Sequence, residues 1–205
     1  MIKAVIFDVD GVLLDSFESN FQFAEKLFRE AGFIPPTREE YVTFFHFSLR
    51  DTIKAVTHLT DESKIDEIWN RGRSGEFDVI DATLPLGAER VLKQLGQDYL
   101  LAIASSRVRS HISQDPLGKL LPYFKATVAY EDTENHKPHP EPLLRAAELL
   151  GVRADECVYV GDVENDAVAA RAAGMKIIIY SRERVNSADA QTDDFNKIPE
   201  LIKSV

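Results

Sequence analysis

The sequence has a single cysteine, Cys157, among its 205 residues. One thiol excludes an internal disulfide and a cysteine-rich zinc site, and the apolar neighbours at 158–160 indicate a small core residue of a strand. No apolar run approaches the ~18 residues that a membrane-spanning helix needs. The first carboxylate, Asp8, comes too early for the apolar core of a signal peptide. We therefore expect a cytoplasmic protein that does not bind a membrane.

Positive charge is also scarce. Lys and Arg number 24 against 34 Asp and Glu, so the net charge is −10. This balance argues against nucleic acid or an anionic membrane as the main partner. An anionic substrate would need a locally positive site, which a metal ion and one or two basic side chains could supply. The length leaves room for a good core and a second, smaller domain.

The chain begins with a short apolar run, residues 2–7, that ends in Asp8, Asp10 and Gly11. A continuous apolar run is typical of a buried strand in a parallel sheet, and Gly11 allows a sharp turn after it. Both carboxylates therefore lie at the carboxyl end of a strand, where open α/β sheets bind their ligands. Residues two apart on a strand share a face, so the two acids can converge on one metal ion or substrate. Taken alone, an acidic turn explains the pattern equally well.

Residues 17–81 show helical periodicity and no convincing strand. Apolar residues recur at helical spacing over 17–31, and a capping-box pattern from Thr37 to Glu40 opens a second helix. Two further helices are predicted, one starting near Asp51 and one fading toward Gly72. This segment is a helical block placed after the first strand.

From residue 84 onward, apolar strands alternate with helices, which predicts an α/β fold with a parallel sheet. The strands are expected at 99–104, 126–129, 158–160 and 176–180, and the helices at 88–95, 141–150, 167–173 and near the end of the chain. We accordingly assign residues 1–16 and 82–205 to the α/β core and residues 17–81 to the inserted helical block.

Polar groups suited to phosphate chemistry follow three of the predicted strands. All strands of a parallel sheet end at one edge, so Ser105 and Asp162 are expected beside the two carboxylates of the first strand. Asp166 lies one helical turn beyond Asp162 and can face the same site. Lys137 precedes the helix at 141–150 and is expected at that edge as well.

Each of these residue types has a chemical use. A carboxylate can attack phosphorus, so that one difficult displacement becomes two easier ones. The attack brings a carboxylate against a phosphate dianion, which calls for a hard cation such as Mg²⁺. An ammonium and a hydroxyl can hold the remaining phosphoryl oxygens, and a second carboxylate can pass a proton to the leaving oxygen and then activate water.

With these motifs in order, the chain resembles the haloacid dehalogenase superfamily, close to its phosphoglycolate-phosphatase and β-phosphoglucomutase branch. The resemblance covers nearly the whole chain, and the helical block matches the cap of that family. It implies a Rossmann-like parallel sheet with helices on both faces and an α-helical cap inserted after the first strand. The matching segments are DVDGVLLDS at 8–16, Ser105 after an apolar strand, KPHPE at 137–141 and GDVEND at 161–166.

The resemblance implies roles for the carboxylates. Asp8 would be the nucleophile and Asp10 the general acid and base. Mg²⁺ would be held by the Asp8 side chain, the Asp10 backbone carbonyl and the Asp162 side chain, and Asp166 would support the metal or the lysine. The alternative for Asp166 is a helix-start acid favoured by the helix dipole.

The same resemblance assigns phosphoryl binding to Ser105 and Lys137. Ser106 is a competing hydroxyl, and we prefer Ser105 because it directly follows the apolar run. The stretch at 44–50 interrupts the helical pattern and resembles the cap loop that reaches the active site in relatives. Within it, His46 and Arg50 are the candidate substrate contacts.

The predicted function is Mg²⁺-dependent hydrolysis of a small phosphorylated metabolite through an aspartyl-phosphate on Asp8, by a monomer or homodimer. A phosphomutase is the alternative, although mutase-type relatives usually carry histidine where this chain has Asn20. A phosphonate hydrolase would need a cap lysine, and neither Lys26 nor Lys54 has a recognisable context. Two alternatives from another class stay open. A phosphoacceptor signalling module would carry its aspartate on a mid-chain strand, whereas Asp8 follows the first strand. A protein-binding relative without catalytic activity would have lost one of the motifs.

Overall fold

A six-stranded parallel sheet forms the core of the protein. A computed structural model describes residues 1–74 and 82–205. The strands lie in the order β3-β2-β1-β4-β5-β6, so that β1 is central, and all neighbours run parallel. Their bounds are β1 Ala4–Phe7, β2 Leu100–Ala104, β3 Ala126–Val128, β4 Cys157–Gly161, β5 Lys176–Tyr180 and β6 Ala190–Thr192.

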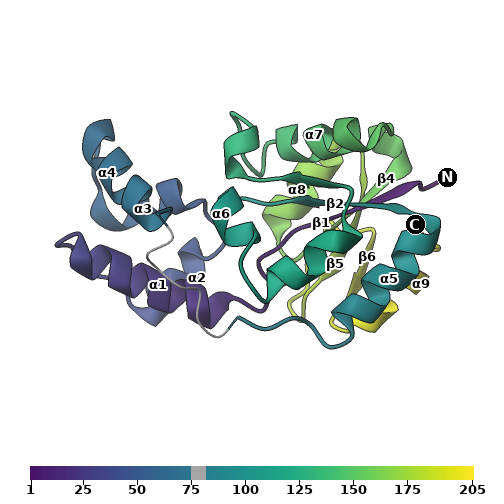
Figure 1. Cartoon of the computed structure of the whole chain (residues 1–205), viewed down its shortest axis with the longest axis horizontal. Helices are drawn as coiled ribbons and strands as arrows, with labels where there is room; N and C mark the ends of the chain where they lie inside the picture. Colours follow the sequence, from purple (N-terminus) through teal and green to yellow (C-terminus); the bar gives the residue numbers. More distant parts are fainter. Residues whose placement is uncertain (75–81) are drawn as a thin grey trace.

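Helices cover both faces of the sheet because both faces of its central strands are apolar. Alternate residues of β1 enter different clusters: Val5 and Phe7 pack on the side of α5 and α9, and Ala4 and Ile6 on the side of α7 and α8. Figure 1 shows these two helix pairs on opposite sides of the sheet. The helices are α5 Ala88–Asp98, α7 Glu141–Leu150, α8 Glu164–Ala173 and α9 Ile198–Ile202.

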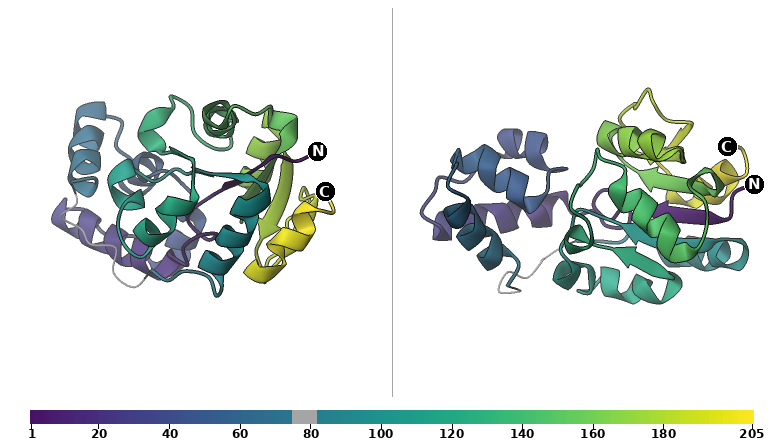
Figure 2. Two further views of the ribbon diagram at one scale, coloured as in Figure 1. Left: turned by 45° about the vertical axis from the view of Figure 1, so that its right-hand side comes forward. Right: turned by 90° about the horizontal axis from the view of Figure 1, so that it is seen from above.

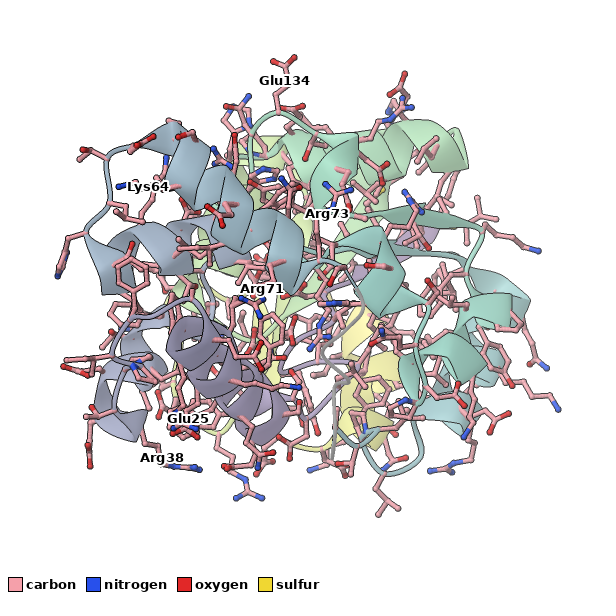
Figure 3. All side chains as sticks on the ribbon, turned by 60° about the vertical axis from the view of Figure 1, so that its left-hand side comes forward. Glu25, Arg38, Lys64, Arg71, Arg73 and Glu134 are labelled. Atoms are coloured by element: carbon pink, nitrogen blue, oxygen red, sulfur yellow. The ribbon has the colours of Figure 1, made fainter. Side chains whose placement is uncertain are left out.

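Of the helices described between β1 and β2, the first four form a separate lobe, which we call the cap. They are α1 Phe17–Glu30, α2 Arg38–Phe44, α3 Leu49–Thr57 and α4 Glu62–Gly72. The cap has a hydrophobic cluster of its own, centred on Leu27, Phe28 and Ile53. It lies over the carboxyl ends of the strands, and both chain termini lie at the far end of the core (Figures 1 and 2). Charged side chains such as Arg38 and Lys64 lie on its outer surface (Figure 3).

The predicted fold class is confirmed, and the local differences have simple causes. Helix α5 was predicted at 88–95 and ends at Asp98, so it continues through Gly96 despite the cost of about 0.5–1 kcal/mol for a glycine inside a helix. Helix α3 starts at Leu49 instead of near Asp51, because Ser48 accepts the Asp51 N–H and caps it. Strand β6 has only three half-buried residues and gave no sequence signal.

The boundaries assigned to the cap stay a prediction, and residues 75–81 lie outside the described part. The remaining helical segments are the short helix α6 Arg109–Ile112 and the 3₁₀ turns Leu117–Tyr123, Tyr130–Asp132, Ala154–Glu156 and Phe195–Lys197. None of the described helices is both long and apolar enough to span a bilayer.

Candidate active site

The carboxyl ends of β1, β2 and β4 and the loop before α7 meet under the cap. They enclose a cavity of about 30 Å³. The predicted site residues among those lining it are Asp8, Asp10, Ser105, Lys137, Asp166 and His46, with Ser106 beside them. The fold therefore collects side chains that are up to 158 positions apart in the sequence.

The Lys137 ammonium is the centre of the polar network. It lies 2.7 Å from Asp8 Oδ2 and 2.8 Å from Asp166 Oδ1, and it donates to the Tyr159 hydroxyl at 2.9 Å. Burial alone would lower the pKa of Lys137, but the charges of Asp166 and Asp8 outweigh it and raise the pKa. The ammonium thus contacts Asp8, Asp166 and Tyr159 at once. Tyr159 was missed because a tyrosine inside an apolar strand carries no functional signal.

Asp166 acts as a support for its neighbours. One of its carboxylate oxygens accepts the backbone N–H of Asp162 at 3.0 Å and of Val163 at 3.3 Å, and the other binds Lys137. The approach is so close that a Cβ on Gly161 would lie 2.4 Å from the Asp166 Cβ. Glycine at 161 is therefore a steric requirement of this site.

Three carboxylates gather at the base of the cavity in an arrangement that fits a divalent cation. One oxygen each of Asp8, Asp162 and Asp166 lies within 4.8 Å of the others. Asp162 Oδ1 is buried without a hydrogen-bond partner, which is costly unless a cation binds it. Lys137 compensates one of the three charges, so two formal negative charges remain. Carboxylate oxygens are the ligands that Mg²⁺ prefers, and the described residues fit that ion.

Burial raises the pKa values of two of these carboxyl groups, and the neighbouring charges add to the effect. Burial, together with the charges of Asp166 and Asp8, raises the pKa of Asp162 to about 10. Burial also raises the pKa of Asp8 to about 7, although Lys137 opposes the shift. Without a bound cation, both carboxyl groups therefore hold a proton to higher pH than an ordinary aspartate does.

We expect Mg²⁺ to stabilise the protein more at pH 8 than at pH 5.5. A carboxyl group whose pKa is higher in the folded than in the unfolded protein contributes to the stability of the fold at low pH, and this contribution is lost as pH rises. For Asp8 the loss runs from about pH 4 to about pH 7, and for Asp162 it continues to about pH 10. Mg²⁺ restores it by binding the ionised forms. At 100-fold excess over Kd the gain is about 2.7 kcal/mol, or roughly 5–11 °C in Tm. Thermal melts with and without Mg²⁺ at both pH values measure this; equal shifts at the two pH values would contradict it.

Asp10 turns to the other side of the cavity and binds Arg107. The guanidinium donates from Nε to Asp10 Oδ2 at 2.8 Å and from Nη2 to Oδ1 at 2.6 Å. Nη2 also donates to Asn20 Oδ1 at 2.8 Å, while the Asn20 amide and the Ser16 hydroxyl donate to Asp10 Oδ1. Burial opposes ionisation, but the Arg107 charge and these hydrogen bonds lower the pKa of Asp10 to about 2. Asp10 is therefore held as a carboxylate.

Arg107 is the main site residue that the sequence did not reveal. The available signal in the sequence was a basic residue two positions after Ser105. Many surface arginines also lie close in sequence to a serine, so this signal alone did not indicate a site residue. The Arg107 side chain is only 7% exposed, and its backbone N–H donates to Ser105 Oγ at 3.1 Å. The Ser105 hydroxyl proton thus stays available for a phosphoryl oxygen. Ser106 lines the same cavity.

The two cap candidates have different surroundings. His46 lines the cavity, with Nδ1 3.8 Å from Asp162 Oδ2, and burial lowers the pKa of its imidazole. Arg50 lies in α3, where Glu62 and Asp66 each bind its guanidinium at 2.5 Å, and it is not among the described residues that line the cavity. The carboxylates of α4 hold the Arg50 cation, whereas Arg107 reaches the cavity through its contact with Asp10. A contact of Arg50 with substrate stays a prediction.

Comparison with known proteins identifies the family. The family model of the haloacid dehalogenase-like hydrolases matches residues 5–180. The chain belongs to this family. Pyrophosphatase PpaX of Bacillus cereus is 32% identical over 187 residues, which cover 88% of this chain and 83% of the relative. A PpaX of Bacillus thuringiensis is 31% identical with the same coverage.

Solved haloacid dehalogenase-like structures share the fold over nearly the full chain. A superfamily hydrolase of subfamily IA from Geobacter sulfurreducens is 28% identical, with a TM-score of 0.70 over 98% of this chain and 96% of the other. A β-phosphoglucomutase from Clostridium difficile is 22% identical, with a TM-score of 0.77 over 100% and 96%. A predicted phosphoglycolate phosphatase from Haemophilus somnus is 19% identical, with a TM-score of 0.76 over 98% of each chain. The last two likenesses concern the fold alone.

Proposed function

We propose that this hydrolase is a Mg²⁺-dependent phosphatase that removes the phosphoryl group of a small metabolite through an aspartyl-phosphate on Asp8. The observation that carries the proposal is the Asp8–Lys137–Asp166 network, in which one ammonium holds the nucleophile 2.7 Å away and is itself held by a second carboxylate. The carboxylate cluster with its unpartnered Asp162 oxygen supports the metal.

In the first half of the reaction, an Asp8 carboxylate oxygen forms a bond to phosphorus as the ester P–O bond breaks. Lys137 and the Ser105 hydroxyl hold the phosphoryl oxygens while charge spreads over them. When bound, Mg²⁺ supplies compensation for the phosphoryl charge, and Asp8, the Asp10 carbonyl and Asp162 would hold it. Asp166 positions both the lysine and the backbone of Asp162.

In the second half, water attacks the phosphorus of the aspartyl-phosphate and passes a proton to Asp10, which frees Asp8 and phosphate. The ionised state of Asp10 suits this step, because a base must be unprotonated. Donation of a proton to the leaving oxygen in the first half requires Asp10 to be protonated, and hence a weaker Arg107 contact. The Asp10–Arg107 ion pair keeps Asp10 unprotonated. It therefore favours the second half of the reaction, in which Asp10 acts as a base toward water.

Pyrophosphate hydrolysis is the second candidate, because relatives that cover most of the chain are named pyrophosphatases. Phosphate is a good leaving group and makes little demand on a general acid. A phosphomutase is less favoured, since Asn20, which holds Asp10 at 2.8 Å, cannot shuttle a proton as histidine does.

Phosphate release from a panel of metabolite esters, pyrophosphate and acetyl phosphate tests the proposal. We expect turnover of at least one compound with Mg²⁺ and a loss of about 10²-fold or more after removal of the metal with EDTA, restored by excess Mg²⁺. Turnover of the whole panel at the same rate in EDTA would contradict a metal-dependent phosphatase.

A further inference from the structure

Tyr159 is a fully buried polar side chain of β4 whose hydroxyl reaches across the sheet. Strand β1 lies between β4 and β2 in the sheet order, yet the Tyr159 hydroxyl donates to the Ala104 carbonyl of β2 at 3.1 Å. Ala104 follows Ile103, the register partner of Phe7, so this carbonyl lies at the level of Asp8. The tyrosine side chain therefore crosses β1 close to the nucleophile.

The direction of each hydrogen bond at this hydroxyl follows from the chemistry of its partners. An ammonium has three donors and no acceptor, so Lys137 donates to the Tyr159 oxygen, at 2.9 Å. The single hydroxyl proton is then left for another oxygen. The Ala104 carbonyl is the nearer one at 3.1 Å, against 3.5 Å for Asp166 Oδ1. Strand β2 thus holds the hydroxyl, and the hydroxyl holds one N–H of the ammonium.

The three contacts of the Lys137 ammonium differ in kind. Asp8 and Asp166 bind it through charge, at 2.7 and 2.8 Å, whereas Tyr159 is a neutral acceptor. In the proposed reaction, Lys137 must turn a donor to a phosphoryl oxygen as charge spreads over that group. If the contacts to Asp166 and Tyr159 stay in place, the remaining N–H is directed toward Asp8, where the phosphoryl group is transferred.

From this geometry we infer that Tyr159 is a positioning residue for phosphoryl transfer. Its hydroxyl, anchored to the Ala104 carbonyl, orients the Lys137 ammonium toward the phosphoryl group on Asp8. Tyr159 is not among the described residues that line the cavity, so it acts through Lys137 and not on the substrate. The inference rests on the proposed function and adds an uncharged residue to a site whose other parts are charged groups and serine.

Tyr159→Phe removes the hydroxyl and changes no charge, and it keeps the ring, whose centroid lies 5.5 Å from the ammonium. With Mg²⁺, we expect kcat for acetyl phosphate, or for a faster compound of the panel, to fall about 10-fold or more, as for a lost hydrogen bond to a charged group. KM should stay within about 3-fold, because the Lys137 charge remains and only its alignment is lost. A folded variant with the wild-type kcat, or one in which KM alone rises, overturns the inference.

Cys157→Ala is the matched control for a purely structural effect. Cys157 is also fully buried, belongs to the same strand and the same hydrophobic cluster, and its thiol donates to a backbone carbonyl, that of Arg153, at 3.3 Å. Loss of this buried group should lower Tm and leave kcat and KM at their wild-type values. If kcat falls in parallel with Tm in both variants, Tyr159 only supports the fold and the inference is wrong.

A second substitution tests the path through Lys137. In a Lys137→Met background, Tyr159→Phe should change kcat by less than about 2-fold, because no ammonium is left to orient. An equal loss with and without Lys137 would place the effect on β2, through the Ala104 carbonyl, and overturn the inference while the phosphatase proposal stands. Failure of the wild-type protein to release phosphate from any compound of the panel overturns the proposed function instead.

The ammonium can also be observed without turnover, which keeps the test valid if Lys137→Met does not fold. ¹H–¹⁵N spectra resolve lysine ammonium groups whose protons exchange slowly with water, and Lys137→Arg, which keeps a cation, identifies the Lys137 signal by its loss. We expect the Lys137 protons to exchange faster in Tyr159→Phe than in the wild-type protein, and at the wild-type rate in Cys157→Ala. Equal exchange rates in Tyr159→Phe and the wild-type protein would contradict the inference.

Discussion

Asp8→Asn should lower kcat by about 10⁴-fold or more, because an amide does not attack phosphorus and the residual rate then depends on binding and electrostatics alone. The variant should fold normally. Burial raises the pKa of Asp8 to about 7, so loss of this charge removes a costly ionisation, and Lys137 keeps Asp166 as its partner.

Phosphate release and a thermal melt, both with Mg²⁺, measure these two effects. Asp15→Asn is the matched control, since Asp15 is an exposed carboxylate of the same segment, and it should leave kcat unchanged. A folded Asp8→Asn protein that releases phosphate at near the wild-type rate would falsify the assignment of the nucleophile.

Asp10→Asn should affect both turnover and stability, and a second substitution separates the two. Turnover should fall by ~10²–10⁴-fold, the range for a lost acid–base group. Stability should also fall, by about 3–5 kcal/mol, because the buried Arg107 loses its carboxylate partner. For a chain of this size that is roughly 6–20 °C in Tm.

Adding Arg107→Met to Asp10→Asn replaces the buried ion pair by groups that need no counter-charge, and should restore much of the Tm. It should not restore turnover. The Mg²⁺ concentration for half-maximal stabilisation should stay near the wild-type value in the double variant, because the proposed Asp10 contact is a backbone carbonyl. Recovery of turnover together with Tm would mean that Asp10 supports the fold and takes no part in proton transfer.

The sequence by itself determined the sheet and the edge at which the site lies. Continuous apolar runs such as residues 99–104 are typical of strands that helices cover on both faces, and parallel strands end at a common edge. Asp8, Ser105 and Asp162 directly follow such runs, so their meeting was predictable from position alone. The capping box of Thr37 and Glu40 is equally local, and the structure contains it.

Only the tertiary structure decided which charges meet. Arg50 and Arg107 look alike in the sequence, yet their partners differ. Two carboxylates of α4 bind Arg50, whereas Arg107, in the segment after β2, binds Asp10, which is 97 positions away in the sequence. The same holds for Tyr159, whose hydroxyl reaches Lys137. The hydrophobic periodicity of a helix or strand indicates which of its faces is buried. The partner of a charged side chain depends instead on how helices and strands that are distant in the sequence pack together. That packing made Asp10 an ionised partner of Arg107.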